Sequence, residues 1–125
     1  MKICITSMGE DTSADVDPRF GRCKYFLIVD TETMDISSIS NESISSSGGA
    51  GIKAAQIVAK TGVGTVITGN IGPNAFQTLT AAGIKVITGA NGTVNQVVER
   101  FKKGELKVID TPSVGSHFGM GGRRG

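Results

Sequence analysis

Residues 24–39 read KYFLIVDTETMDISSI, and this stretch decides the fold. The aromatic and β-branched run 24–30 is typical of a strand, and residues 34–39 alternate apolar with polar side chains as a second strand would. Only Thr31-Glu32-Thr33 separates the two runs. Because so short a link joins antiparallel neighbours, we predict a β-hairpin here.

The rest of the chain alternates strand and helix patterns. Right-handed crossovers make strands one, four and five parallel, and the hairpin places strands two and three antiparallel on the other side of strand one. The sequence therefore predicts an α/β fold with a five-stranded mixed sheet in the order 3-2-1-4-5, flanked by three helices. The further strands are expected at 2–6, 65–68 and 84–88, and the helices at 50–60, from Pro73 to Gly83, and from Thr93, which forms a capping box with Gln96, to Gly104.

Composition narrows the class of protein. A chain of 125 residues is one domain by size, and we expect it to span residues 1–110, followed by a flexible Gly-rich tail over 111–125. The net charge of +2 is too small to predict a nucleic-acid partner. No long apolar run predicts a membrane span, and the N-terminus lacks a signal-peptide pattern. We therefore expect a cytoplasmic protein whose two cysteines stay reduced.

The predicted topology brings four loops to one edge of the sheet. Residues 7–23, 41–51, 69–74 and 89–93 all leave or enter strands at that edge. It includes the switch point between strands one and four, where open α/β sheets bind ligands. Any binding site is therefore expected at this edge.

Two segments at this edge could favour an anion. Residues 45–51 read SSSGGAG and run into a predicted helix N-terminus, where free backbone N–H groups and the helix dipole attract negative charge. The alternative is an ordinary flexible connection with a serine cap. Arg19 and Arg22 flank Phe20-Gly21, and two guanidinium groups could hold an anion together. They could equally be solvated, or paired with the neighbouring acidic loop.

Soft metal ligands are few. Cys4 lies within the first strand and is expected in the core. Cys23 begins the second strand at the edge and is a candidate thiolate ligand. His117 lies in the tail with Met120 and is the second candidate metal ligand, the alternative being a solvated tail.

Signatures of enzymes are missing from the sequence. It has no P-loop, no zinc-ligand spacing and no nucleophile elbow. Glu10, Asp11, Asp15 and Asp17 share one loop and are interpreted as solvated charge, not as a paired acid and base. These observations favour a binding protein over an enzyme.

Three motifs in order resemble one known family. Residues 19–26 (RFGRCKYF), 48–52 (GGAGI) and 72–76 (GPNAF), the last followed by GIKV at 83–86, are similar to the dinitrogenase iron–molybdenum cofactor biosynthesis family. This is the NifX type, also seen as the C-terminal domain of NifB, and it is related to nitrogen fixation. The resemblance covers residues 1 to about 109.

The resemblance implies a ribonuclease H-like fold and a non-catalytic role. It implies one cofactor-binding domain that binds or carries an iron–molybdenum, iron–sulfur or molybdenum–copper–sulfur cluster, with cofactor-assembly proteins as partners. It implies binding residues in the matching motifs and loops: Arg19, Phe20, Gly21, Arg22, Gly48, Gly49, Gly51, Asn70, Gly72 and Asn74.

Two alternatives come from other classes. A ribonuclease H-like nuclease needs clustered carboxylates, beginning on strand one, to hold two metal ions. Strand one reads KICIT and has no acid, so this alternative is disfavoured. A regulatory or interaction domain that binds no cluster stays open on sequence alone.

Overall fold

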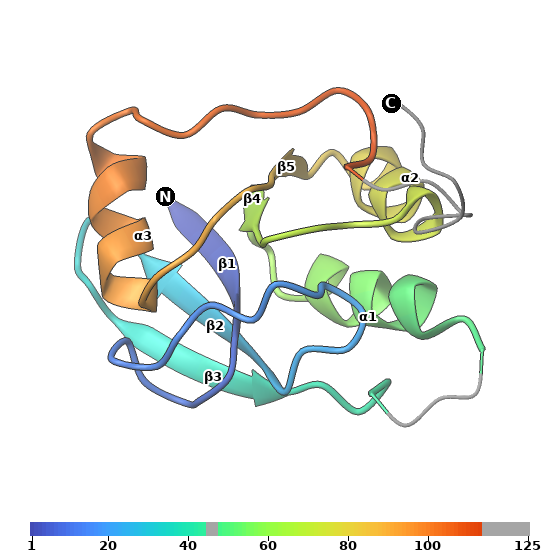
Figure 1. The fold of residues 1–125 in the computed structure, drawn as a ribbon, viewed down its shortest axis with the longest axis horizontal. Coiled ribbons are helices and arrows are strands. Elements are labelled where there is room, and N and C mark those ends of the chain that lie inside the picture. Colours follow the sequence, from blue (N-terminus) through green and yellow to red (C-terminus); the bar gives the residue numbers. More distant parts are fainter. Residues whose placement is uncertain (45–47, 114–125) are drawn as a thin grey trace.

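The computed structural model describes residues 1–44 and 48–113 of the chain. It is an α/β structure in which one mixed sheet lies between helices (Figure 1). The elements are β1 Lys2–Ser7, β2 Tyr25–Asp30, β3 Ile36–Ser40, α1 Ala50–Ala59, β4 Thr65–Ile67, α2 Pro73–Ala81, β5 Lys85–Ile87 and α3 Val94–Lys102.

The five named strands lie in the order β3-β2-β1-β4-β5, as predicted. The β1–β2 and β2–β3 pairs are antiparallel, and the β1–β4 and β4–β5 pairs are parallel. The loops that follow β1, β4 and β5 therefore gather at one edge of the sheet, together with the loop that enters β2. This confirms the arrangement of loops from which the site was expected.

The expectation of only five strands needs a correction at the outer side of β5. Val108 forms an antiparallel bridge with Ile87, and the Ile109 N–H donates to the Val86 carbonyl at 2.8 Å. This one-residue segment adds a sixth position to the sheet, in the order 3-2-1-4-5-6. Leu106 and Ile109 pack against different core clusters on the two faces of the sheet, which fixes the segment along the edge.

The alternation of side chains along the strands divides the core into two clusters. On β1, Cys4 belongs to the cluster covered by α1 and α2, while Ile3 and Ile5 belong to the cluster covered by α3. Figure 1 shows α3 at one side of the sheet and the α1–α2 pair at the other. Both faces of β1 are therefore buried, which explains its nearly continuous apolar sequence.

The hairpin is as predicted, but its second strand starts later. Met34 has a positive φ of 63°, and its N–H donates to the Asp30 carbonyl at 2.7 Å. The Asp30 carboxylate also accepts the Glu32 N–H at 2.9 Å. Because these contacts build a turn that includes Met34, β3 begins at Ile36 rather than at residue 34.

The capping box at the start of α3 gives a test of the helix assignment. The Thr93 hydroxyl accepts the Gln96 N–H at 3.1 Å, and the Gln96 side chain accepts the Thr93 N–H at 3.0 Å. We expect Thr93→Ala to lower the free energy of unfolding by about 1 kcal/mol, because it removes this cap. Urea denaturation measures the change. Thr80→Ala, at an exposed threonine inside α2, is the control and should cost less. Equal losses in both variants would contradict the cap.

Candidate functional site

The long loop after β1 is tied to the β4–α2 connection. The Asn70 N–H donates to the Pro18 carbonyl at 2.7 Å, and the Phe20 N–H donates to the Asn70 carbonyl at 3.2 Å. Gly69 lies so close to Pro18 that a Cβ on Gly69 would be 2.6 Å from the Pro18 Cα. Only glycine permits this approach, and it brings residues 19–21 beside the start of α2.

The same loop also contacts the start of α1. A Cβ on Gly21 would lie 3.1 Å from both the Cα and the backbone nitrogen of Gly51. A Cβ on Gly51 would in turn lie 3.4 Å from the Cβ of Ala75 in α2. The buried Asn41 amide holds the loop from behind by donating to the Gly21 carbonyl at 3.2 Å. Three segments that are distant in sequence therefore meet at small residues.

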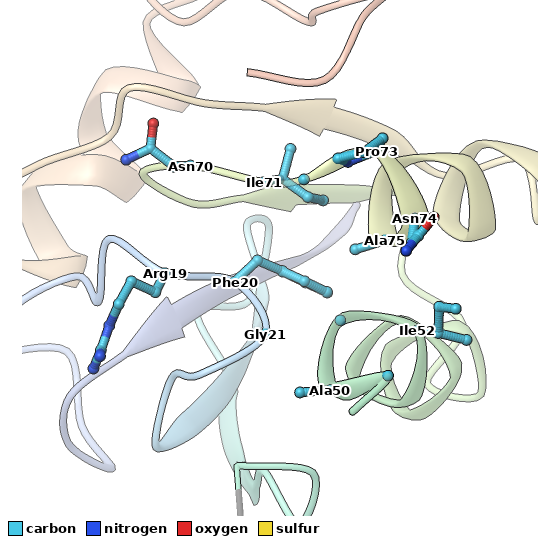
Figure 2. A pocket seen from close by; sticks show the side chains of 13 residues that line it. Arg19, Phe20, Gly21, Ala50, Ile52, Asn70, Ile71, Pro73, Asn74 and Ala75 are labelled. Atoms are coloured by element: carbon cyan, nitrogen blue, oxygen red, sulfur yellow. The ribbon is translucent and has the colours of Figure 1, made fainter. Parts of the chain in front are cut away.

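A cavity of about 490 Å³ opens where these segments meet (Figure 2). Its size is within the usual range of small-molecule sites. Both helices contribute their N-cap and first three residues, so two helix N-termini face one space. The lining consists of Arg19, Phe20, Gly21, Gly49, Ala50, Gly51, Ile52, Asn70, Ile71, Gly72, Pro73, Asn74 and Ala75.

The cavity favours negative charge through its backbone. Neither N-cap, Gly49 or Gly72, provides a side-chain cap for its helix, and neither helix has an acid in its first turn. The first N–H groups of a helix have no acceptor within it, and the helix dipole adds positive potential at the same place. No lining residue is Asp or Glu. Gly49 turns into α1 with a φ of 71°, a conformation that suits glycine.

The two arginines that were predicted to bind an anion contact different parts of the protein. The Arg22 guanidinium donates to the Ile44 carbonyl at 2.8 Å, and Arg22 is not among the lining residues. Arg19 lines the cavity, but Figure 2 shows its side chain directed away from the space between α1 and α2. Its Nε lies 3.5 Å from an oxygen of Asp17. In this structure the two guanidinium groups do not form a joint clamp around the cavity.

The predicted thiolate ligand is buried. Cys23 has no exposed surface, and its Sγ donates to the Phe20 carbonyl at 3.2 Å. Burial, reinforced by the charge of Asp17, raises the pKa of the Cys23 thiol to about 12. Burial also raises the pKa of Cys4 well above its usual value, and Cys4 lies in the core as expected. The structure therefore gives no support to Cys23 as a metal ligand, because the side chain is a neutral core thiol behind the cavity.

Not all of the acidic side chains in the loop after β1 are exposed to solvent. Asp11 and Asp15 are exposed, but the Asp17 side chain is 1% exposed, contrary to the sequence interpretation. The Asp17 N–H donates to the Thr6 carbonyl at 2.9 Å, and the Thr6 hydroxyl lies 2.7 Å from the Asp17 carbonyl. These contacts, with the antiparallel bridge between Ser7 and Val16, pair the loop with the end of β1 and place Asp17 in the interior.

The structure brings most of the predicted binding residues into one place. Gly48 is described but does not line the cavity, and His117 and Met120 lie outside the described residues. Five lining residues were not predicted, although all but Ile71 belong to the first turns of two predicted helices. Predicted residues that line the cavity are Arg19, Phe20, Gly21, Gly49, Gly51, Asn70, Gly72 and Asn74, and the unpredicted ones are Ala50, Ile52, Ile71, Pro73 and Ala75.

The fold and this cavity define a small α/β protein with a ligand-sized site between two helix N-termini. The chain belongs to the dinitrogenase iron–molybdenum cofactor family, whose sequence model matches residues 1–104. The resemblance inferred from the three motifs is thereby confirmed.

Several known proteins are similar to this chain. The apo form of the orange protein from Desulfovibrio gigas is 46% identical, with a TM-score of 0.87 over 90% of this chain and 95% of that one. A Thermotoga protein described as a NifB candidate of the DUF35 family is 39% identical, with a TM-score of 0.77 over 88% and 94% of the two chains. A Methanocaldococcus jannaschii protein is 32% identical over 76% of this chain and 83% of its own.

The close approach of Gly21 to α1 can be tested by adding a methyl group. We expect Gly21→Ala to lower the free energy of unfolding by about 1–3 kcal/mol, because its Cβ meets backbone atoms of Gly51 that cannot rotate away. Gly64→Ala is the matched control, since its Cβ would meet nothing within 4 Å. Thermal and urea denaturation compare the two. A control as unstable as Gly21→Ala would contradict the packing argument.

The cysteines give a test of their burial. We expect both Cys4 and Cys23 to react slowly with an aromatic disulfide reagent at pH 8 in the folded protein, because the reactive thiolate is scarce and covered. In denaturant both should react fully within the same time, which is the control for reagent quality. Rapid reaction of one thiol in the folded protein would show that it is accessible, and mass spectrometry would identify which.

Proposed function

We propose that this protein binds and carries an anionic metal–sulfur cluster in the cavity between α1 and α2. The observation that carries the proposal is the symmetry of the lining, in which the N-cap to N3 residues of both helices border one space. An anion there would lie at the positive ends of two helix dipoles and could accept hydrogen bonds from backbone N–H groups at both helix starts. In α2 these donors are Asn74 and Ala75, because Pro73 has no N–H.

The lining chemistry suits a cluster that brings its own ligands. None of the thirteen lining residues is Cys, His, Asp or Glu. Across residues 1–44 and 48–113, no group of three or more such side chains could hold a metal ion. A cluster whose metals already carry a full sulfide shell needs no protein ligand. Its sulfur atoms can accept N–H hydrogen bonds while its faces contact Phe20, Ile52 and Ile71.

The type of cluster follows from this fit. An iron–sulfur cluster held by protein thiolates needs several accessible cysteines, and the described cysteines are both buried. We therefore favour an iron–molybdenum or molybdenum–copper–sulfur cluster whose ligands come with it, because none of the lining residues is Cys, His, Asp or Glu. The match to the dinitrogenase iron–molybdenum cofactor family supports a cluster that contains molybdenum.

The wider role is part of the proposal. We assign the protein to carriage rather than catalysis, with cofactor-assembly proteins as the donors or acceptors of its cluster. We place it in the cytoplasm, where Cys4 and Cys23 would stay reduced. No helix in the described part of the chain is long and apolar enough to cross a membrane. We also place the fold within the ribonuclease H-like group and keep residues 1–110 as the binding domain.

An isosteric charge change separates binding from folding. Asn74 is the second residue of α2 and lines the cavity. Asn74→Asp should stabilise the helix slightly, because an acid at an N-terminus is favourable. The same change should weaken binding of tetrathiomolybdate about tenfold through like-charge repulsion. Anaerobic titration, followed by the visible absorption of the ion, measures the affinity, and denaturation measures the stability.

Gln77→Glu is the matched control for this experiment. It adds the same charge one turn further along α2, at an exposed residue outside the lining. Its affinity should stay within about twofold of the unaltered protein, as expected for a screened surface charge. If Asn74→Asp binds as well as Gln77→Glu, the anion is not held at the α2 N-terminus. If the unaltered protein binds no thiomolybdate or iron–sulfur species, the proposed function is wrong.

A further inference from the structure

A buried carboxylate lies next to the proposed anion site without lining it. Asp17 is 1% exposed and sits between the end of β1 and the residues that border the cavity. The Thr6 hydroxyl that contacts the Asp17 carbonyl also lies 2.8 Å from the Thr68 hydroxyl, and both threonines are fully buried. Asp17 is therefore held by Thr6 of β1, whose hydroxyl is itself positioned by Thr68, the residue after β4.

The Asp17 side chain holds Arg19 by two groups. One carboxylate oxygen accepts the Arg19 backbone N–H at 3.0 Å, and the same oxygen lies 3.5 Å from the Arg19 Nε. The Arg19 side chain is 64% exposed, so nothing but this ion pair and its own backbone limits its direction among the described contacts. Figure 2 shows it directed away from the space between α1 and α2.

We propose that Asp17 limits the affinity of the cavity for anions. The Asp17 carboxylate pairs with the Arg19 guanidinium and so keeps that positive charge away from the cavity. This inference rests on the proposed function, and it adds the residue that sets how firmly the cargo is held. The backbone N–H groups at the starts of α1 and α2 attract the anion, while the ion pair with Asp17 neutralises the charge of Arg19. A protein that must pass its cargo on gains from such a limit, because a full charge pair with the anion would slow release.

The charges explain the direction of the expected effect. With Asp17 in place, the pair presents nearly no net charge to the cavity. Replacing the carboxylate by an amide keeps an oxygen that can accept the Arg19 N–H, but it leaves the guanidinium without its ion-pair partner. The anion can then attract Arg19, which already borders the cavity.

A double-mutant cycle with tetrathiomolybdate tests the proposal. We expect Asp17→Asn to lower the Kd about threefold to fivefold at low salt, the size typical of a partly exposed charge. The gain should shrink with increasing salt. In the Arg19→Gln background the same Asp17→Asn change should give a clearly smaller gain, because no guanidinium is left to release. The difference between the two gains is the coupling between Asp17 and Arg19.

Asp15→Asn is the matched control. Asp15 is an exposed acid in the same loop, two residues away, and its removal changes the net charge by the same amount. It should alter the Kd by less than Asp17→Asn does. Weaker binding by Asp17→Asn, an equal gain in Asp15→Asn, or an equal Asp17→Asn gain with and without Arg19 would each overturn the proposal. Circular dichroism confirms that every variant is folded.

A measurement without ligand separates this inference from the proposed function. The Arg19 Nε–H resonance in a ¹⁵N-labelled protein reports the ion pair directly, and it should shift in Asp17→Asn but not in Asp15→Asn. If the unaltered protein binds no thiomolybdate while this shift is seen, the pair exists and the proposed function fails. If thiomolybdate binds but the Nε–H resonance is unchanged by both Asp17→Asn and the ion, the role of Asp17 fails alone.

Discussion

The backbone bridge between Arg19 and Asn70 is the contact on which the site depends. It joins the loop after β1 to the connection that leads from β4 into α2, and it forms only because Gly69 lets the Pro18 backbone approach. The contact of Gly21 with α1 and the hydrogen bond from Asn41 then hold the far side of the loop. With this bridge in place, Phe20 lies at 2% exposure and lines the cavity, its side chain directed toward the two helix starts. One pair of main-chain hydrogen bonds thus couples the sheet topology to the shape of the site.

The order of the strands was predictable from the sequence because it follows from simple constraints. The three-residue link at Thr31–Thr33 dictates a hairpin, and handed crossovers fix the parallel strands. The start of α3 was equally clear, since Thr93 and Gln96 satisfy each other's backbone groups locally. The short edge segment at Val108 was not predictable as a strand, because a single bridge leaves no alternation to detect. Its position depends on packing of Leu106 and Ile109 around the sheet edge.

Some parts of the candidate site could likewise be predicted from the sequence, and others could not. Gly49, Gly72 and their helix starts could be placed at one edge because helix N-termini have sequence signals and the topology brings them together. The direction of a long side chain has no such signal. Arg19 and Arg22 read alike in the sequence, yet one pairs with Asp17 and the other reaches the Ile44 carbonyl. Likewise Asp17 could not be told from its exposed neighbours, because its burial comes from the pairing of the loop with Thr6 at the end of β1.

The site combines two sources of charge, the helix N-termini and the Asp17–Arg19 ion pair. They differ in how easily they can change, which bears on how the proposed cargo could be held and released. The attraction comes from main-chain dipoles that are fixed by the helices and cannot be removed by one side-chain substitution. Apart from Arg19, the side chains that line the cavity are uncharged, so they shape it without adding charge. The flanking ion pair is the part whose charge can be redistributed, since Arg19 is exposed while Asp17 is not. A fixed attraction beside an adjustable charge would suit the proposed carrier role, in which the protein must hold its cargo and also release it.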